Sequence, residues 1–101
     1  MSKTIYYPPT RGDKDKTKIS LCLTYSDDLI IYFTDPGHFS DSNQNAFTDP
    51  IPTGKFGPDN KIGPYSPETT DSNVKLKFKD EITKLTYEYD ITIQAAPCPQ
   101  H

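Results

Sequence analysis

Strict alternation of apolar and polar side chains is the feature that most constrains this chain, because it is the period of a half-buried β-strand. It occurs in segments 18–25, 74–79 and 85–93. The apolar sets predicted to face a core are Ile19, Leu21, Leu23 and Tyr25; Val74, Leu76 and Phe78; and Leu85, Tyr87, Tyr89, Ile91 and Ile93. The alternation therefore predicts at least three strands.

Two other segments also have the character of strands. Segment 29–33 is a continuous β-branched and aromatic run, which predicts a strand buried on both faces or near the centre of a sheet. Segment 4–7 predicts a short edge strand, because Pro8 and Pro9 follow it and lack amide hydrogens. No apolar stripe with helical spacing is present, and a turn at 80–84 is the only weak helical candidate.

Segment 35–73 holds six of the ten prolines and four of the five glycines. A structureless connection of this length is unusual in a compact domain, so the segment is a functional loop, a loop that hides short strands, or a partly disordered stretch. A short strand at 46–48 is one candidate. Because disordered segments are poor in aromatic residues, the rings along it predict anchors onto the sheet. These rings are Phe39, Phe47, Phe56 and Tyr65.

The length of 101 residues predicts one domain, 1–101, since a second core could not be filled. Two predicted hairpins, in 18–33 and 74–93, an edge strand and a long connection favour an all-β fold. The expected fold is a small two-layer antiparallel β-sandwich, of immunoglobulin-like or cupredoxin-like Greek-key type, with one long Pro/Gly-rich loop. A small barrel is the competing architecture.

Charge and hydropathy exclude some classes of function. The net charge of −3 argues against binding to a nucleic acid, which requires clustered cations. We expect no membrane span and, by default, a cytoplasmic location, since neither a long apolar run nor an export signal is seen. Cys22 and Cys98 are too few for a disulfide framework and are expected to be free thiols.

Two metal sites are alternatives to a metal-free domain. His38, Cys98 and His101 resemble the copper ligands of cupredoxins in their order, although no methionine follows them. A second set of side chains could supply oxygen ligands to Ca²⁺. Its spacing resembles that of the first half of an EF-hand loop, but the glycine that should follow and the closing Glu are missing. These donors are Asp41, Asn43 and Asn45, with Asp59 and Asn60 further on. We therefore predict no metal and no cofactor.

Catalysis is not expected, because the sequence has no nucleophile motif and few candidate bases. The acidic pairs 27–28 and 80–81 are interpreted as turn residues. Arg11-Gly12-Asp13 matches an adhesion tripeptide that arises readily by chance. The lysines at 75, 77 and 79 either protect a strand face or edge or steer an acidic partner, with Glu88 and Asp90 on the neighbouring strand partly neutralising them.

The sequence thus predicts a non-enzymatic binding or assembly module. Segment 35–73 would present Phe39, Phe47, Phe56 and Tyr65 as exposed rings to a protein or carbohydrate partner. The alternatives are a structural subunit that self-associates, for instance as a homodimer, through edge segment 4–7, and a calcium- or copper-binding sandwich.

Overall fold

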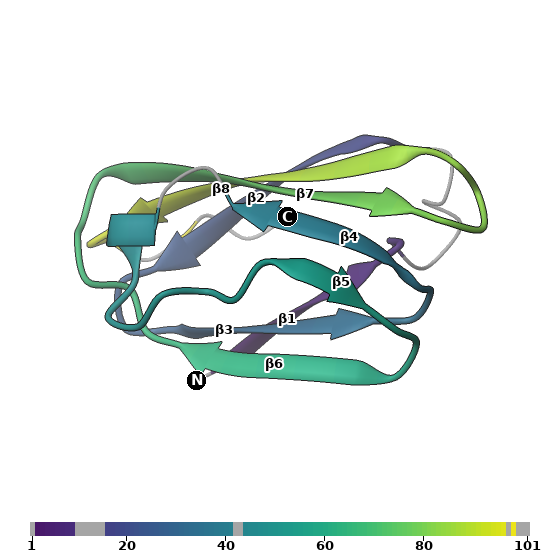
Figure 1. Cartoon of the computed structure of the whole chain (residues 1–101). Coiled ribbons are helices and arrows are strands. Elements are labelled where there is room, and N and C mark those ends of the chain that lie inside the picture. Colours follow the sequence, from purple (N-terminus) through teal and green to yellow (C-terminus); the bar gives the residue numbers. More distant parts are fainter. Residues whose placement is uncertain (1, 10–15, 42–43, 97, 99–101) are drawn as a thin grey trace.

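The computed structural model describes residues 2–9, 16–41, 44–96 and 98. In chain order its elements are β1 (Ser2–Tyr7), β2 (Lys18–Thr24), β3 (Asp28–Phe33), β4 (Gly37–Asp41), the 3₁₀ turn η2 (Gln44–Ala46), β5 (Gly54–Phe56), β6 (Asn60–Tyr65), β7 (Ser72–Asp80) and β8 (Thr86–Gln94). A three-stranded sheet in the order β1-β3-β6 packs on a five-stranded sheet in the order β2-β8-β7-β4-β5 (Figure 1). The predicted all-β two-layer sandwich is confirmed.

Both sheets are mixed, whereas the sequence predicted antiparallel pairing throughout. β1 runs parallel to β3, and β2 runs parallel to β8, while the remaining pairs are antiparallel. The predicted hairpin in 18–33 does not form, because the turn after β2 carries the chain from one sheet to the other. Leu23 and Leu29, on either side of that turn, are both fully buried in the shared core. The parallel pairs also depart from the antiparallel sheets of immunoglobulin constant domains.

Segment 35–73 is not one long loop, since it contains β4, η2, β5 and β6. Of the three alternatives, the loop that hides short strands is the one found. Alternation could not reveal these strands, because β4 has a single large apolar residue, Phe39, and β5 has only three residues. The candidate strand at 46–48 is reduced to an isolated bridge between Phe47 and Pro67.

Aromatic rings form the centre of the core. The Tyr7 ring lies 5.9 Å from Phe33, 5.8 Å from Phe39 and 5.3 Å from Phe78, measured between centroids. The Tyr7 hydroxyl donates a hydrogen bond to the Leu76 carbonyl of the facing sheet. Strand β1 therefore contributes both apolar surface and a polar link to the opposite layer.

The strand predictions fail mainly at strand ends. Tyr25 and Leu85, both predicted to face the core, are 46% and 41% exposed, because β2 stops at Thr24 and β8 starts only at Thr86. The predicted edge strand is confirmed as β1, at the edge of the three-stranded sheet, and 29–33 lies within β3 at its centre. Burial alternates along β3, so that strand is not buried on both faces.

No helix in the described ranges has the length and apolar character needed to span a membrane.

Gly37 is required by close packing between β4 and β7. A Cβ atom there would lie 2.3 Å from the Lys79 carbonyl oxygen and 2.4 Å from Phe78 Cζ. We expect Gly37→Ala to lower the free energy of unfolding by roughly 1–3 kcal/mol, as overpacking does. At Gly57 the nearest atom would be 3.7 Å away, so Gly57→Ala is the matched control. Urea unfolding of both variants checks this, and equal stabilities would contradict it.

Burial raises the pKa of Tyr7 well above its ordinary value near 10. The folded state favours the neutral phenol, so this contribution to stability is complete below about pH 10 and is lost as the pH rises further. Tyr7→Phe removes the hydroxyl and its buried hydrogen bond to the Leu76 carbonyl, which costs about 0.5–1.5 kcal/mol at neutral pH. The stability gap between parent and variant should narrow from pH 8 to pH 11 in urea unfolding. A constant gap would contradict this account.

Candidate functional site

The four rings nominated from the sequence belong to the core. Phe39 and Phe47 are 0% and 3% exposed, and Phe56 and Tyr65 are half-buried against the core. Phe56 stacks on Phe33 at 4.7 Å between centroids. The predicted anchoring is confirmed, but the exposed rings that the binding hypothesis required are not present at these positions. Phe39 lies on the inward face of β4, so its ring points away from any partner.

The copper ligand set does not assemble, and the prediction of free thiols is wrong. Cys98 forms a disulfide with Cys22, so its sulfur is not available as a thiolate. His38 pairs with Lys79 near the end of β7, whereas Cys22 pairs with Thr92, whose partner on β7 is near its start. The two positions are thus at opposite ends of the five-stranded sheet. His101 lies outside the described residues.

Two of the oxygen donors considered for calcium, Asp59 and Asn60, accept hydrogen bonds from other residues, while Asp41 ends β4 and Asn45 lies in η2. Asp59 Oδ1 accepts a hydrogen bond of 2.7 Å from the Tyr32 hydroxyl, and Asn60 Oδ1 accepts one of 2.7 Å from the Gly57 amide. Asn43 and the tripeptide 11–13 lie outside the described residues. Within the part of the chain that is described, no three His, Cys, Asp or Glu side chains gather as metal ligands.

The acidic pairs lie at strand ends, since Asp28 begins β3 and Asp80 ends β7. Asp80 Oδ1 accepts the amides of Ile82 and Thr83 at 2.7 and 2.9 Å, which closes the turn between β7 and β8. Asp28 Oδ1 accepts a hydrogen bond of 2.8 Å from the Ser66 hydroxyl. Asp80 thus closes a local turn, whereas Asp28 links the start of β3 to the residue after β6.

A group of basic side chains lies on the outer face of the five-stranded sheet. His38 on β4 pairs with Lys55 on β5 and with Lys79 on β7, and all three are exposed. Lys77 follows on the same face of β7 and is 54% exposed. We call Lys55, His38, Lys79 and Lys77 the basic corner. Only the β7 lysines could be recognised from the sequence, because Lys55 and His38 are brought beside them by the pairing of β4 with β5 and β7.

Counter-charges reach only one side of this group. Lys77 Nζ lies 3.8 Å from Glu88 Oε1 on β8, and Lys75 pairs in register with Asp90. The predicted cross-strand neutralisation of the lysines is therefore present on the β8 side. Among the described residues, Lys55 and Lys79 have no ion pair. Lys55 and Lys79 lie on the strands to either side of His38, and among the described residues cross-strand ion pairs do not account for this group.

Edge protection does not explain the β7 lysines. β7 is the middle strand of the five, with β8 and β4 hydrogen-bonded on either side. Edge lysines guard unpaired backbone groups, and an interior strand has none to guard. Two interpretations from the sequence remain, namely protection of the exposed face of β7 and an electrostatic contact with an acidic partner.

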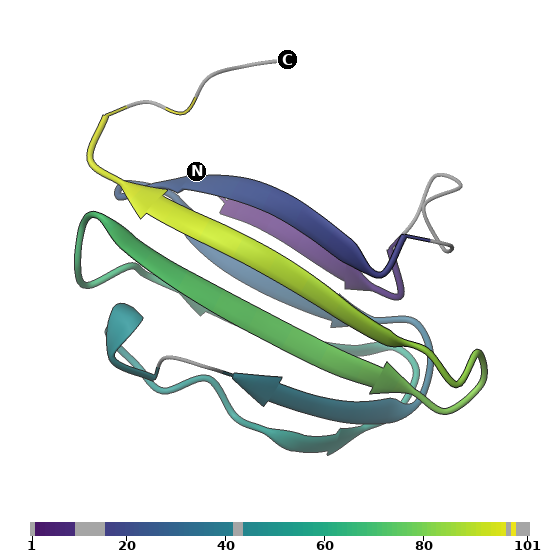
Figure 2. The same cartoon turned by 90° about the horizontal axis from the view of Figure 1, so that it is seen from above.

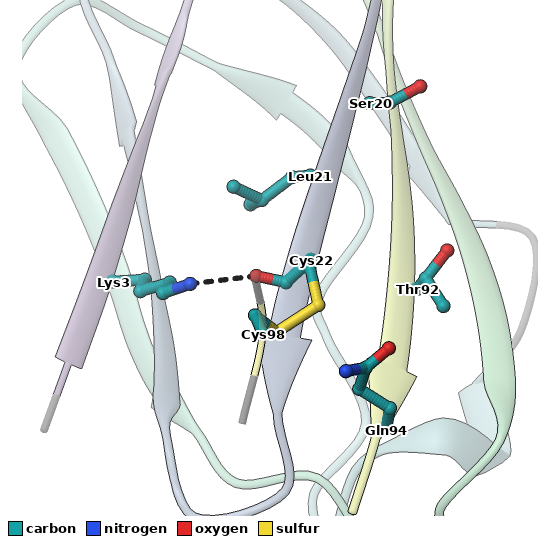
Figure 3. Close-up of a pocket in the computed structure, with 7 residues that line it drawn as sticks. All are labelled: Lys3, Ser20, Leu21, Cys22, Thr92, Gln94 and Cys98. Atoms are coloured by element: carbon teal, nitrogen blue, oxygen red, sulfur yellow. Dashed lines mark hydrogen bonds between the residues drawn. A yellow bond between two sulfur atoms is a disulfide. The ribbon is translucent and has the colours of Figure 1, made fainter. Parts of the chain in front are cut away.

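A second feature is a shallow hollow beside the disulfide, with a volume of about 440 Å³ (Figure 3). Lys3 Nζ donates a 2.8 Å hydrogen bond to the Cys22 carbonyl at its rim. The Cys98 amide donates to Thr24 Oγ1 at 3.2 Å, so the tail after β8 is attached to β2 by both covalent and polar contacts. The other residues that line the hollow are Ser20, Leu21, Thr92 and Gln94.

The disulfide joins residues that are 76 positions apart. Loop-closure entropy gives such a link roughly 4 kcal/mol of stabilisation, through the unfolded chain. We expect Cys22→Ser/Cys98→Ser to lower the free energy of unfolding by up to that amount, measured by urea titration. A reductant should destabilise the parent similarly and leave the double variant unchanged. A parent insensitive to reductant would show that the bond does not form.

Comparisons with known proteins supply no relative from which a function could be transferred. No protein-family model, no curated protein and no solved structure matches the chain significantly.

Proposed function

We propose that this chain is a non-enzymatic binding module that contacts an acidic segment of a partner protein through the basic corner. The observation that carries the proposal is the row Lys55, His38 and Lys79 across three neighbouring strands, in a chain whose net charge is −3. A local patch opposite in sign to the whole molecule orients a charged partner during encounter.

A protein partner is favoured over a carbohydrate. Stacking on a sugar requires an exposed ring face, and the rings of 35–73 are buried or half-buried. The basic corner instead offers ammonium groups on a pleated surface, which suit carboxylate side chains. The proposed contact therefore depends on the ammonium groups of the basic corner and not on exposed aromatic rings.

The contacts described above also bear on the predicted self-association, on catalysis and on the cellular location. Self-association through β1 has less support, because the Lys3 ammonium lies across the gap to β2 and is bonded there. The hypothesis of an enzyme gains no support from the acidic pairs, because Asp80 closes a turn and Asp28 is bonded to Ser66. We also propose an oxidising compartment in place of the expected cytoplasmic location, because disulfides are rare in the cytosol.

Charge reversal at the basic corner tests this function. We expect Lys79→Glu to weaken binding of a short poly-L-glutamate peptide by about three- to tenfold, since an exposed charge pair contributes up to about 1 kcal/mol. The affinity of the parent should fall as salt rises to about 0.15 M. Isothermal titration calorimetry at two salt concentrations measures both effects.

Lys61→Glu is the matched control, because Lys61 lies on β6 of the other sheet and the change in net charge is identical. It should leave the affinity close to that of the parent. Equal weakening by both variants would show that only the net charge matters and would overturn the basic corner as the contact. Absence of binding by the parent at low salt would overturn the acidic partner.

A further inference from the structure

Exposed aliphatic side chains gather in the turn between β7 and β8. Among the described residues four large hydrophobic side chains are exposed, and two of them, Ile82 at 65% and Leu85 at 41%, lie in this turn. Single exposed apolar residues are ordinary on a protein surface, whereas two in one short turn offer a partner a shared apolar contact. The turn lies at one end of the sandwich and extends past the start of β4 (Figures 1 and 2).

The turn is closed by polar contacts and not by burial of these aliphatic groups. Asp80 Oδ1 accepts the amides of Ile82 and Thr83, and the Tyr87 hydroxyl donates a hydrogen bond of 3.2 Å to Thr83 Oγ1. With about two thirds of its surface exposed, Ile82 contributes little to the core. The presence of an isoleucine at this position is therefore not explained by the stability of the turn.

The apolar turn is continuous with the basic corner. Lys79 lies three positions before Ile82, and it pairs in register with Thr86, which directly follows Leu85. Because three residues span at most about 11 Å, one short partner segment can contact Lys79 and both aliphatic side chains. Lys84 is also exposed and adds an ammonium group within the turn. The basic face and the apolar turn thus meet at one rim of the sandwich.

We propose that the segment bound by the basic corner has apolar side chains at one end of its acidic run, and that these pack against Ile82 and Leu85. This inference rests on the proposed function of the basic corner and specifies the chemistry of its partner. Carboxylates of the partner match the ammonium groups of the basic corner, while its apolar end removes exposed aliphatic surface from water. An apolar contact bordered by polar groups is the usual composition of a protein interface.

A peptide fits this surface better than a lipid bilayer. The basic corner lies on the face of the five-stranded sheet, whereas Ile82 lies beyond the ends of β7 and β8, so a ligand has to bend around the rim to contact both. A peptide can bend in this way, but a bilayer is flat on the scale of one domain. Glu81 is exposed beside Ile82 and would be repelled by anionic headgroups, whereas the apolar end of a peptide places no carboxylate there.

Two synthetic peptides of equal length and charge test the proposal. Both are short runs of L-glutamate, and one ends in a pair of leucines where the other ends in a pair of glycines. The parent should bind the leucine peptide about four- to fifteenfold more tightly, as expected for burial of one or two methylene groups. Because ions do not screen an apolar contact, this ratio should persist as sodium chloride lowers both affinities. Fluorescence anisotropy of labelled peptides measures the dissociation constants.

A variant of the turn locates the apolar contact. Ile82→Ser should remove the advantage of the leucine peptide and leave the affinity for the glycine peptide unchanged. Tyr25→Ser is the matched control and should keep the advantage, because Tyr25 is 46% exposed but follows β2 at the opposite end of the same sheet. The methyl resonances of Ile82 in the parent give a readout that needs no variant, and they should shift more with the leucine peptide than with the glycine peptide.

The possible results separate this inference from the function on which it rests. Equal binding of the two peptides would overturn the apolar contact and leave the proposed function standing, whereas binding of neither would overturn both. A leucine advantage that persists in Ile82→Ser would place the contact elsewhere and overturn the inference. Binding of the parent to phosphatidylserine vesicles that is lost in Ile82→Ser would also overturn it, because the turn would then contact lipid.

Discussion

Tyr7 is the side chain on which contact between the two sheets depends most. It enters from an edge strand, yet its ring contacts Phe33 in its own sheet and Phe39 and Phe78 in the other. Its hydroxyl also donates a hydrogen bond to the Leu76 carbonyl of the facing sheet, so the ring is held by a polar contact as well as by packing. Because β1 has only six residues, this one ring accounts for much of the attachment of the strand. The aromatic cluster also explains how a chain of modest apolar content fills a core.

The sequence predicted the fold class well because alternation reports directly on one-sided burial. It identified β2, β7 and β8 and placed β3 at a sheet centre. It missed β4 and β5, whose apolar content is too low to show a period, and it missed the parallel pairs, since pairing partners are set by packing between distant segments. The turn after β2 looked like a hairpin turn because local residues cannot show that Leu23 and Leu29 lie in different layers.

The candidate site was less predictable than the fold. Aromatic rings in a proline-rich segment suggested a contact surface. The sequence could not show that these rings are buried, because the sheet that covers them comes from distant segments. The lysines of β7 were visible as a stripe, whereas His38 and Lys55 join them only through register. The disulfide was equally hidden, because two cysteines 76 positions apart give no spacing signal. Each of these features depends on long-range pairing.

The parallel pairing of β2 with β8 bears on how the chain reaches its fold. Each pair in that ladder is 70 positions apart, as for Lys18 and Glu88. Closing so long a loop carries a large entropic cost, and folds rich in such contacts form slowly. During synthesis β2 emerges long before its only neighbour in the sheet, so its backbone waits unpaired until nearly the whole domain has left the ribosome. Completion of the larger sheet therefore has to wait for the synthesis of β8.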